Sequence, residues 1–185
     1  MLIARRRLRL RARPGDRLKI GGCATGARSY VAIAGGIDGD AVFGSVSTYL
    51  PAGLGGRDGR ALAAGDRLCI AGRVPDPPAE TASPPAFRPV LSHTCALRIC
   101  EGAEAGRRSG AAYEALLAAN WTVGRRADRM GLELTGAPLD VDSGGRLPSA
   151  AVFPGTVQVP ENGVPFLLGV DAQTTGGYPR IAQVA

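Results

Sequence analysis

Lysine is nearly absent from this sequence, since Lys19 is the only one among 185 residues. This excludes a P-loop nucleotide site, whose G-x-x-x-x-G-K-[ST] motif requires a lysine after the glycines. It also argues against a biotin carrier, because Lys19 stands in the sequence Arg-Leu-Lys-Ile without the methionines that flank a biotinylated lysine. We therefore expect no covalent biotin on this chain.

Histidine is equally scarce. A zinc site built on His93, Cys95 and Cys100 would have irregular ligand spacing and would need Cys23 or Cys69 as a fourth ligand. A Ser-His-Asp triad would have to use His93, which lies beside a proline-rich stretch, and no G-x-S-x-G motif is present. We predict neither a metal site nor a serine nucleophile.

Long hydrophobic runs are also missing. No segment approaches the roughly 18 apolar residues of a membrane span, and no apolar region of a signal peptide follows the basic N-terminus. The four cysteines include no C-x-x-C pair. Without an export signal we expect reduced thiols, a cytoplasmic protein and no membrane partner.

The net charge of +6 is concentrated at one end of the chain. Eight basic residues and one aspartate give residues 1–19 a charge of +7, so the remainder carries −1. From Leu8 to Arg13, apolar and basic residues alternate, which is the period of a half-buried strand. This favours a solvated strand face over a nucleic-acid arm, and we expect no nucleic-acid partner.

High glycine and proline contents, 27 and 14 residues, favour turns and short strands over long helices. A short repeat pairs residues 15–21 with 65–71, each a Gly-Asp turn that opens a predicted strand. Another strand is predicted over residues 29–34, before a Gly35-Gly36 turn. Six prolines between residues 74 and 89 indicate an extended linker.

The second half of the sequence predicts one helix among strands. Ser109 can cap a helix over residues 111–119, with Tyr113, Leu116 and Leu117 as its buried face. Strands are predicted over residues 96–100, 156–159 and 166–170, a turn followed by a strand over 129–134, and extended structure over 121–123. The fold class is therefore mainly β.

A dense polar cluster follows the apolar run of residues 166–170. Polar side chains and a glycine pair at the end of a strand favour a loop that faces a ligand over a self-satisfied turn. The cluster consists of Asp171, Gln173, Thr174, Thr175, Gly176, Gly177, Tyr178 and Arg180.

Residues 158–160 and 171–182 closely resemble the signature of the allophanate hydrolase subunit 2 family. That family includes the C subunit of 5-oxoprolinase, the KipA proteins and part of the carboxyltransferase region of urea carboxylase. Three further blocks agree, at residues 30–38, 44–57 and 128–131. Four ordered blocks together make the resemblance specific.

The resemblance implies cyclophilin-like β-barrel domains. We expect residues 1–74 to be the C-terminal part of a first β domain, 75–88 the linker, and 89–185 a second domain that lacks its last strand. The chain thus resembles the middle and later part of a longer protein, or a degraded copy. It also has Ala150 where family members usually carry an acidic residue after the serine.

The resemblance implies a component of a bacterial ATP-dependent 5-oxoprolinase, which hydrolyses the ring amide of 5-oxoproline to give glutamate. ATP would be shared with two partners: a KipI-like (allophanate hydrolase subunit 1-like) B subunit and an A subunit. Asp171 and Arg180 are the predicted catalytic residues. The predicted substrate-binding residues are Arg129, Ser149, Gln158, Gln173, Thr174, Thr175, Gly176, Gly177 and Tyr178.

The sequence leaves three alternatives open. One is a carboxyltransferase module of a urea carboxylase-type enzyme, with biotin on a separate chain. Another is a KipA-like regulatory binding protein without catalytic activity, which the alanine at position 150 favours. The third is a non-functional fragment.

Overall fold

The computed structural model describes residues 2–3, 10–23, 26, 28–73, 92–108, 110–141 and 147–185. The chain divides into two units, Met1–Thr94 and Cys95–Ala185. The proline-rich linker predicted over residues 75–88 lies outside the described residues, so the three-part domain division stays a prediction.

The first unit consists mostly of turns and bends. Strand β1 (Leu2–Ile3) pairs in parallel with β2 (Leu18–Lys19), and a 3-10 helix, η1, spans Leu50–Ala52. Single bridges such as Ile37 to Ile70 join the remaining segments. Among residues 10–23, 26, 28–73 and 92–94 of this unit only Gly55 and Gly59 are buried, so this part has no apolar core.

Two strands expected in this unit do not form. Residues 29–34 pair with no neighbouring segment, and Tyr30, Val31 and Ile33 are exposed. The basic strand expected from Leu8 lies partly outside the described residues, and residues 10–13 of it are not a strand. An alternating pattern alone is insufficient, because a strand needs a partner for its backbone hydrogen bonds.

The two copies of the Gly-Asp repeat adopt the same turn. The amide of Asp16 donates to the carbonyl of Arg13 (3.0 Å), and the Arg13 amide donates back to the Asp16 carboxylate (2.8 Å). Asp66 makes the same pair of bonds with Ala63, at 3.1 and 2.7 Å. The turns are confirmed. Only the first leads into a paired strand, β2, whereas the second leads to the single bridge at Ile70.

The glycines at residues 53–59 permit close backbone packing in the first unit. Gly59 has φ +64°, and a Cβ there would collide with the carbonyl oxygen of Gly53. Gly55 has φ +70°, and a Cβ there would collide with the carbonyl oxygen of Ser47. Only glycine combines this backbone conformation with such close approach.

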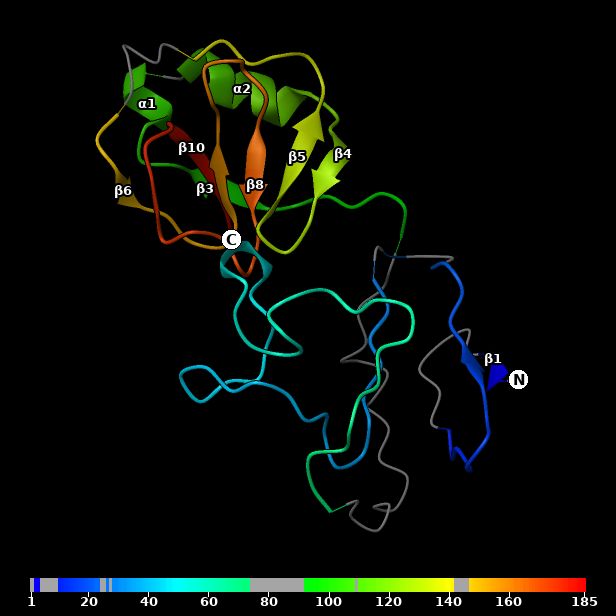
Figure 1. Cartoon of the computed structure of the whole chain (residues 1–185). Helices are drawn as coiled ribbons and strands as arrows, with labels where there is room; N and C mark the ends of the chain where they lie inside the picture. The colour runs from blue at the N-terminus through cyan, green and yellow to red at the C-terminus, as the bar shows by residue number, and fades with distance from the viewer. Residues whose placement is uncertain are drawn as a thin grey trace. The chain divides into compact units, whose positions relative to one another are not determined.

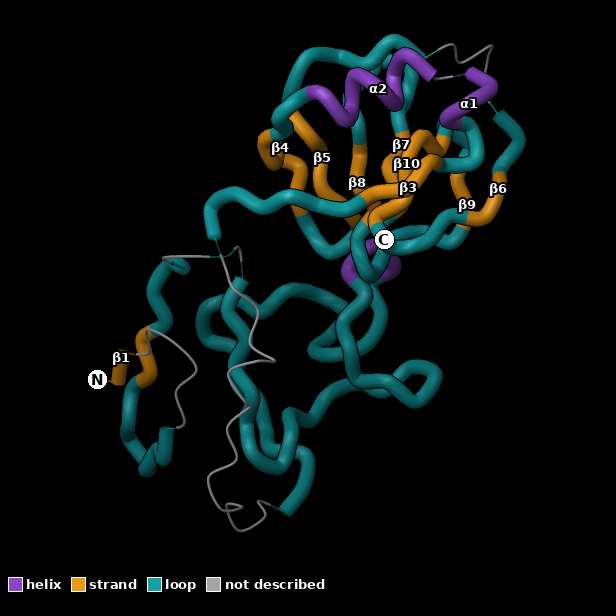
Figure 2. The backbone as a smooth tube through the Cα atoms, turned by 180° about the vertical axis from the view of Figure 1, so that it is seen from behind, coloured by secondary structure: helices purple, strands orange, loops and turns teal. Residues whose placement is uncertain are grey.

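The second unit is built on a six-stranded sheet in the order β3-β10-β7-β8-β5-β4 (Figure 1). All neighbouring pairs are antiparallel. A two-stranded pair, β6 with β9, lies beside the β3–β10 end of the sheet in both Figure 1 and Figure 2. The strands are β3 (Ile99–Glu101), β4 (Thr122–Ala127), β5 (Gly131–Thr135), β6 (Ala150–Ala151), β7 (Thr156–Gln158), β8 (Phe166–Leu168), β9 (Thr175–Gly176) and β10 (Arg180–Val184).

The described residues form a mainly β unit, as predicted, but not a closed barrel. Strands β3 and β4 are the two edges of an open sheet and do not pair with each other. Closure requires hydrogen bonds between the first and last strands, together with a consistent stagger around the sheet. The expected barrel is therefore corrected to an open antiparallel sheet.

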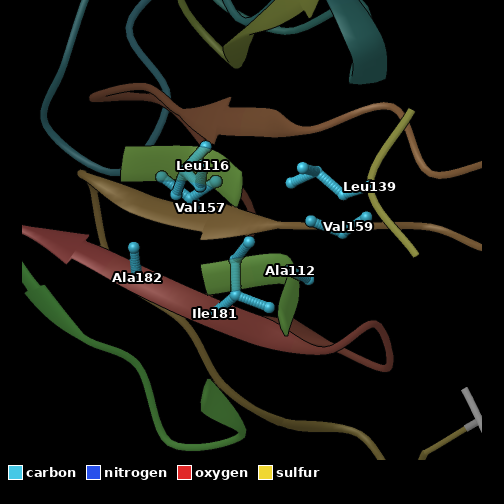
Figure 3. Close-up of a cluster of buried hydrophobic side chains, with 7 residues drawn as sticks. All are labelled: Ala112, Leu116, Leu139, Val157, Val159, Ile181 and Ala182. Atoms are coloured by element: carbon cyan, nitrogen blue, oxygen red, sulfur yellow. The ribbon is translucent and has the colours of Figure 1, made fainter. Parts of the chain in front are cut away.

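Helix α2 (Gly110–Ala118) lies over this sheet and closes the core. Ala112 and Leu116, four residues apart, share one helix face and pack against Val157 and Ile181 (Figure 3). The complete core cluster is Ala112, Leu116, Leu139, Val157, Val159, Ile181 and Ala182.

The helix prediction is confirmed to within one residue at each end, and a short additional helix, α1 (Ala105–Arg108), precedes it. The proposed cap, Ser109, lies outside the described residues. Tyr113 packs against the core as expected, but Leu117 is 51% exposed. The sheet covers only the face that carries Ala112 and Leu116, so the predicted burial of Leu117 was wrong.

The side chain of Trp121 caps the C-terminal end of α2. Its indole Nε1 donates to the carbonyl oxygen of Leu116 at 3.0 Å. This satisfies one of the terminal carbonyls that a helix leaves without an internal partner. The ring also lies where a Cβ at Gly136 would be, 2.6 Å from the nearest ring atom. Trp121 therefore reports on the packing of α2.

Replacing Leu116 by alanine should destabilise the second unit by about 2–5 kcal/mol, because it opens a cavity in the core. Leu117→Ala, one residue further along the same helix, is the matched control and should change stability by no more than about 0.5 kcal/mol. Urea unfolding of the whole chain, followed by the fluorescence of Trp121, measures both. Equal losses in the two variants would contradict the assigned helix face.

Asp66 provides a test of the first unit. The guanidinium of Arg60 and then the amide of Ala63 hydrogen-bond its carboxylate and hold its pKa well below the ordinary value of about 3.9. A carboxylate whose pKa is lowered on folding stabilises the folded state at pH values above its ordinary pKa. That stabilisation is lost as the pH falls through the folded-state pKa. Arg60→Ala should raise the pKa of Asp66, as measured by NMR of its carboxyl carbon. An unchanged pKa would remove Arg60 as the cause.

Candidate functional site

A pocket of about 230 Å³ opens where β6, β9 and the start of β10 meet the segment before α1. It is smaller than the roughly 300–1,000 Å³ of sites for drug-sized molecules. One part of its lining is apolar and the other carries hydrogen-bonding groups. The lining residues are Glu104, Leu147, Pro148, Ala150, Gly176, Tyr178 and Arg180.

Arg180 and Glu104 form a two-pronged ion pair at this pocket. Nη2 of Arg180 donates to Oε1 of Glu104 at 2.6 Å, and Nε donates to Oε2 at 2.9 Å. The backbone adds two bonds: the Arg180 amide donates to Oε2 of Glu104 (2.9 Å), and the Glu104 amide donates to the Arg180 carbonyl (3.2 Å). Paired geometry of this kind fixes position as well as charge.

The same guanidinium also holds β6. Nη1 of Arg180 donates to the carbonyl oxygen of Ala151 at 2.9 Å. Ala151 pairs with Thr175 of β9, and the Val152 amide donates to the carbonyl of Thr174 at 2.9 Å. Arg180 thereby connects the segment before α1, strand β6 and its own strand β10, which are three of the walls around the pocket.

The charge of Arg180 is locally compensated. Its hydrogen bond to Glu104 raises the pKa of the guanidinium, and the two side chains are only 22% and 18% exposed. Among the described residues that line the pocket, these two are the only ionised groups at neutral pH. The described part of the lining therefore carries no net charge.

Gln158 supports the floor of the site. Its side chain is buried, its Nε2 donates to the carbonyl of Tyr178 (3.2 Å), and its Oε1 accepts from Gln173 (3.5 Å). A Cβ at Gly176 would lie 2.5 Å from Gln158 Nε2. A glycine at position 176 therefore lets β9 lie directly over this amide.

Arg129 and Asp171 form a second two-pronged pair, at the turn between β4 and β5. Nε of Arg129 lies 2.5 Å from Oδ2 of Asp171, and Nη2 lies 3.0 Å from Oδ1. The Asp171 amide also donates to the Arg129 carbonyl at 3.0 Å. Neither side chain lines the pocket. The pair joins the start of the β8–β9 loop to the β4–β5 turn.

The structure thus divides the predicted site residues into groups. Gly176, Tyr178 and Arg180 line the pocket, and Gln158 and Gln173 lie next to that lining. Arg129 and Asp171 pair with each other outside it. The remaining predicted residues are exposed or half-buried and are not among the lining residues: Ser149, Thr174, Thr175 and Gly177.

Sequence reasoning missed Glu104, the ion-pair partner of Arg180. The two residues are 76 positions apart in the chain. Glu104 follows a short strand without periodic pattern, and nothing in its neighbourhood distinguishes it from a surface glutamate. No sequence pattern singled out Leu147 and Pro148 either, which lie on the apolar side of the pocket.

A double-mutant cycle measures the coupling free energy between Arg180 and Glu104. We expect a coupling energy of about 1.5–3 kcal/mol, because both groups are largely shielded from water and the hydrogen bonds are charge-assisted. The matched control is Arg126–Glu133, whose arginine is 74% exposed and whose coupling should stay below about 1 kcal/mol. Alanine variants and urea unfolding supply both cycles. A coupling no larger than the control would show that Arg180 does not organise the pocket.

Comparison with known proteins identifies relatives of this chain. Residues 4–185 match the protein family described as carboxyltransferase domain, subdomain A and B. The chain is 40% identical over 174 residues to the C subunit of 5-oxoprolinase from Escherichia coli (strain K12), covering 94% of this chain and 54% of that protein. It is 36% identical over 176 residues to the corresponding C subunit from Haemophilus influenzae, covering 95% and 55%.

The fold has a solved counterpart in the crystal structure of the Kluyveromyces lactis urea carboxylase. That chain is 26% identical, with a TM-score of 0.74 over 88% of this chain and 16% of its own length. Of the helices in the described part of the present chain, none has the length and hydrophobicity to span a bilayer.

The present chain spans about half the length of the two bacterial proteins that it matches. The resemblance found in the sequence motifs is confirmed across nearly all of its length. The chain belongs to the family of carboxyltransferase domains, subdomains A and B, and is a homologue of the C subunit of 5-oxoprolinase.

Proposed function

We propose that this chain is part of the C subunit of a cytoplasmic, ATP-dependent 5-oxoprolinase and contributes a substrate-binding pocket to it. The observation that carries the proposal is the pocket at Arg180, in a homologue of that C subunit. The reaction would consume 5-oxoproline, ATP and two waters and yield glutamate, ADP and phosphate.

The pocket suits a small cyclic amide. Its apolar lining, Leu147, Pro148 and Ala150, matches the methylene groups of a five-membered ring, and its volume of about 230 Å³ suits a molecule of that size. Arg180 and Tyr178 supply hydrogen-bond donors for a carbonyl oxygen. These features support a site in which a lactam is held and oriented.

The described pocket does not fit the phosphates of ATP. A triphosphate needs several cations or a glycine-rich loop of backbone amides. Among the described lining residues the only cation is Arg180, which already pairs with Glu104. We therefore assign no ATP contact to this pocket and propose that the partner B and A subunits hold the nucleotide.

The ion pairs suggest roles for the two predicted catalytic residues. Arg180 contacts the pocket and would donate to the substrate. Asp171 orients Arg129 through two short contacts, and this pairing supports a positioning role for it over proton abstraction. Arg129, Gln158, Gln173 and residues 174–177 would shape the loop around the substrate.

Two alternatives are each favoured by one observation. The likeness to a urea carboxylase supports a carboxyltransferase module that works with biotin on another chain. A KipA-like regulatory role is the other alternative, since Ala150 supplies no carboxylate at the pocket. Carboxyl transfer from carboxybiotin, or tight binding of a B subunit without turnover, would identify these cases.

The experiment is ATP-dependent release of glutamate from 5-oxoproline by this chain with its B and A subunits. Ala150→Leu should raise KM by roughly tenfold or more, because the added side chain occupies the pocket. Ala118→Leu adds the same side chain at an exposed position at the end of α2 and should leave KM unchanged. Absence of glutamate release in the wild-type complex would refute the proposed activity.

A further inference from the structure

The hydrogen-bonding capacity of Arg180 is only partly used. A guanidinium has five N–H donors. Two point to Glu104 and one to the carbonyl of Ala151. Within the described part of the chain the remaining two, one on each terminal nitrogen, have no acceptor. Arg180 therefore presents donors to the pocket while its charge is already matched.

Glu104 makes the pocket unfavourable for an anion. Its carboxylate lies within 2.6–2.9 Å of the Arg180 nitrogens, so a second carboxylate at Arg180 would meet a like charge at close range. Among the described residues of the lining, no second cation compensates for this repulsion. A neutral carbonyl oxygen can accept the same N–H groups without that repulsion.

The other lining residues also favour an uncharged ligand. The phenol of Tyr178 has no hydrogen-bond partner among the described residues and can donate to the same oxygen. Leu147, Pro148 and Ala150 offer apolar surface to ring carbons. Burying a charged group against them would cost free energy, because they provide no compensating contact.

We propose that the pocket takes the lactam end of its substrate, carbonyl oxygen toward Arg180, and leaves the carboxylate outside, and that Glu104 sets this preference. The choice of a lactam rests on the proposed function. Glu104 is a specificity-determining residue in this arrangement, because it acts on the substrate through the charge of Arg180. The cation that receives the substrate carboxylate then lies outside this pocket.

Two five-membered-ring ligands separate the ends of the substrate: 2-pyrrolidinone has the lactam without a carboxylate, and cyclopentanecarboxylate has the carboxylate without a lactam. Their affinities for the complex with the B and A subunits are measured by ligand-observed NMR titration. We expect 2-pyrrolidinone to bind roughly tenfold tighter or more, the ratio expected for a hydrogen bond to a charged group. Ala150→Leu should abolish this binding and Ala118→Leu should preserve it.

Substitution of Glu104 tests the cause of the preference. Glu104→Gln removes the negative charge and should shift the affinity ratio by roughly tenfold or more toward cyclopentanecarboxylate. Glu104→Asp keeps the charge and should keep the preference for 2-pyrrolidinone, which separates charge from general damage to the fold. Circular dichroism of both variants verifies folding.

The outcomes distinguish this inference from the proposed function. Equal or tighter binding of cyclopentanecarboxylate to the wild type, or an unchanged ratio in Glu104→Gln, would overturn the inference even if glutamate is released. A pocket that prefers 2-pyrrolidinone in a complex that releases no glutamate would support the lactam preference and refute the proposed reaction.

Discussion

The ion pair between Arg180 and Glu104 joins the first residue of β10 to the segment that leads into α1. Four hydrogen bonds hold these segments together. Two run from the guanidinium and one from the Arg180 amide to the Glu104 carboxylate, and the fourth runs from the Glu104 amide to the Arg180 carbonyl. The neighbouring backbone packs just as closely, since a Cβ at Gly102 would collide with the Arg180 carbonyl oxygen. Through its third nitrogen Arg180 also fixes β6. The pocket exists because these three segments meet at one side chain.

The core places this side chain accurately. Ile181 and Ala182, directly after Arg180, are fully buried under α2. The register of β10 against β7 shifts between Arg180 and Ala182, and Arg180 lies outside the core cluster that contains both following residues. Packing of Ala112 and Leu116 with Ile181 thus anchors the strand that begins at Arg180.

The two arginine–carboxylate pairs divide the polar residues of the family signature. Arg180 with Glu104 belongs to the pocket, whereas Arg129 with Asp171 joins the β4–β5 turn to the β8–β9 loop. The loop between β8 and β9 therefore runs from one ion pair toward the other. Between them Gln158 and Gly176 make a close contact that positions β9 beneath the pocket. Most of the polar residues of the signature thus hold the loop together, and a few of them line the pocket.

The sequence determined the β-rich class, the position of α2 and the strands near residues 131 and 156, because these depend on local periodicity and turn chemistry. It also identified the family, because four motif blocks occur in order. It failed where an element depends on a distant neighbour. Residues 29–34 alternate like a strand but have no partner, and Leu117 has the right spacing but lies on a side that the sheet does not cover.

Of the residues that line the pocket, Gly176, Tyr178 and Arg180 belong to the polar cluster that the sequence singled out, since they are close together in the chain. Only the tertiary structure decided which carboxylate pairs with which arginine. Asp171 lies nine positions before Arg180, yet it pairs with Arg129, while Glu104 comes from 76 positions away. The physical reason is that ion pairs form between side chains that the sheet and α2 bring together, and separation in sequence carries no information about that distance.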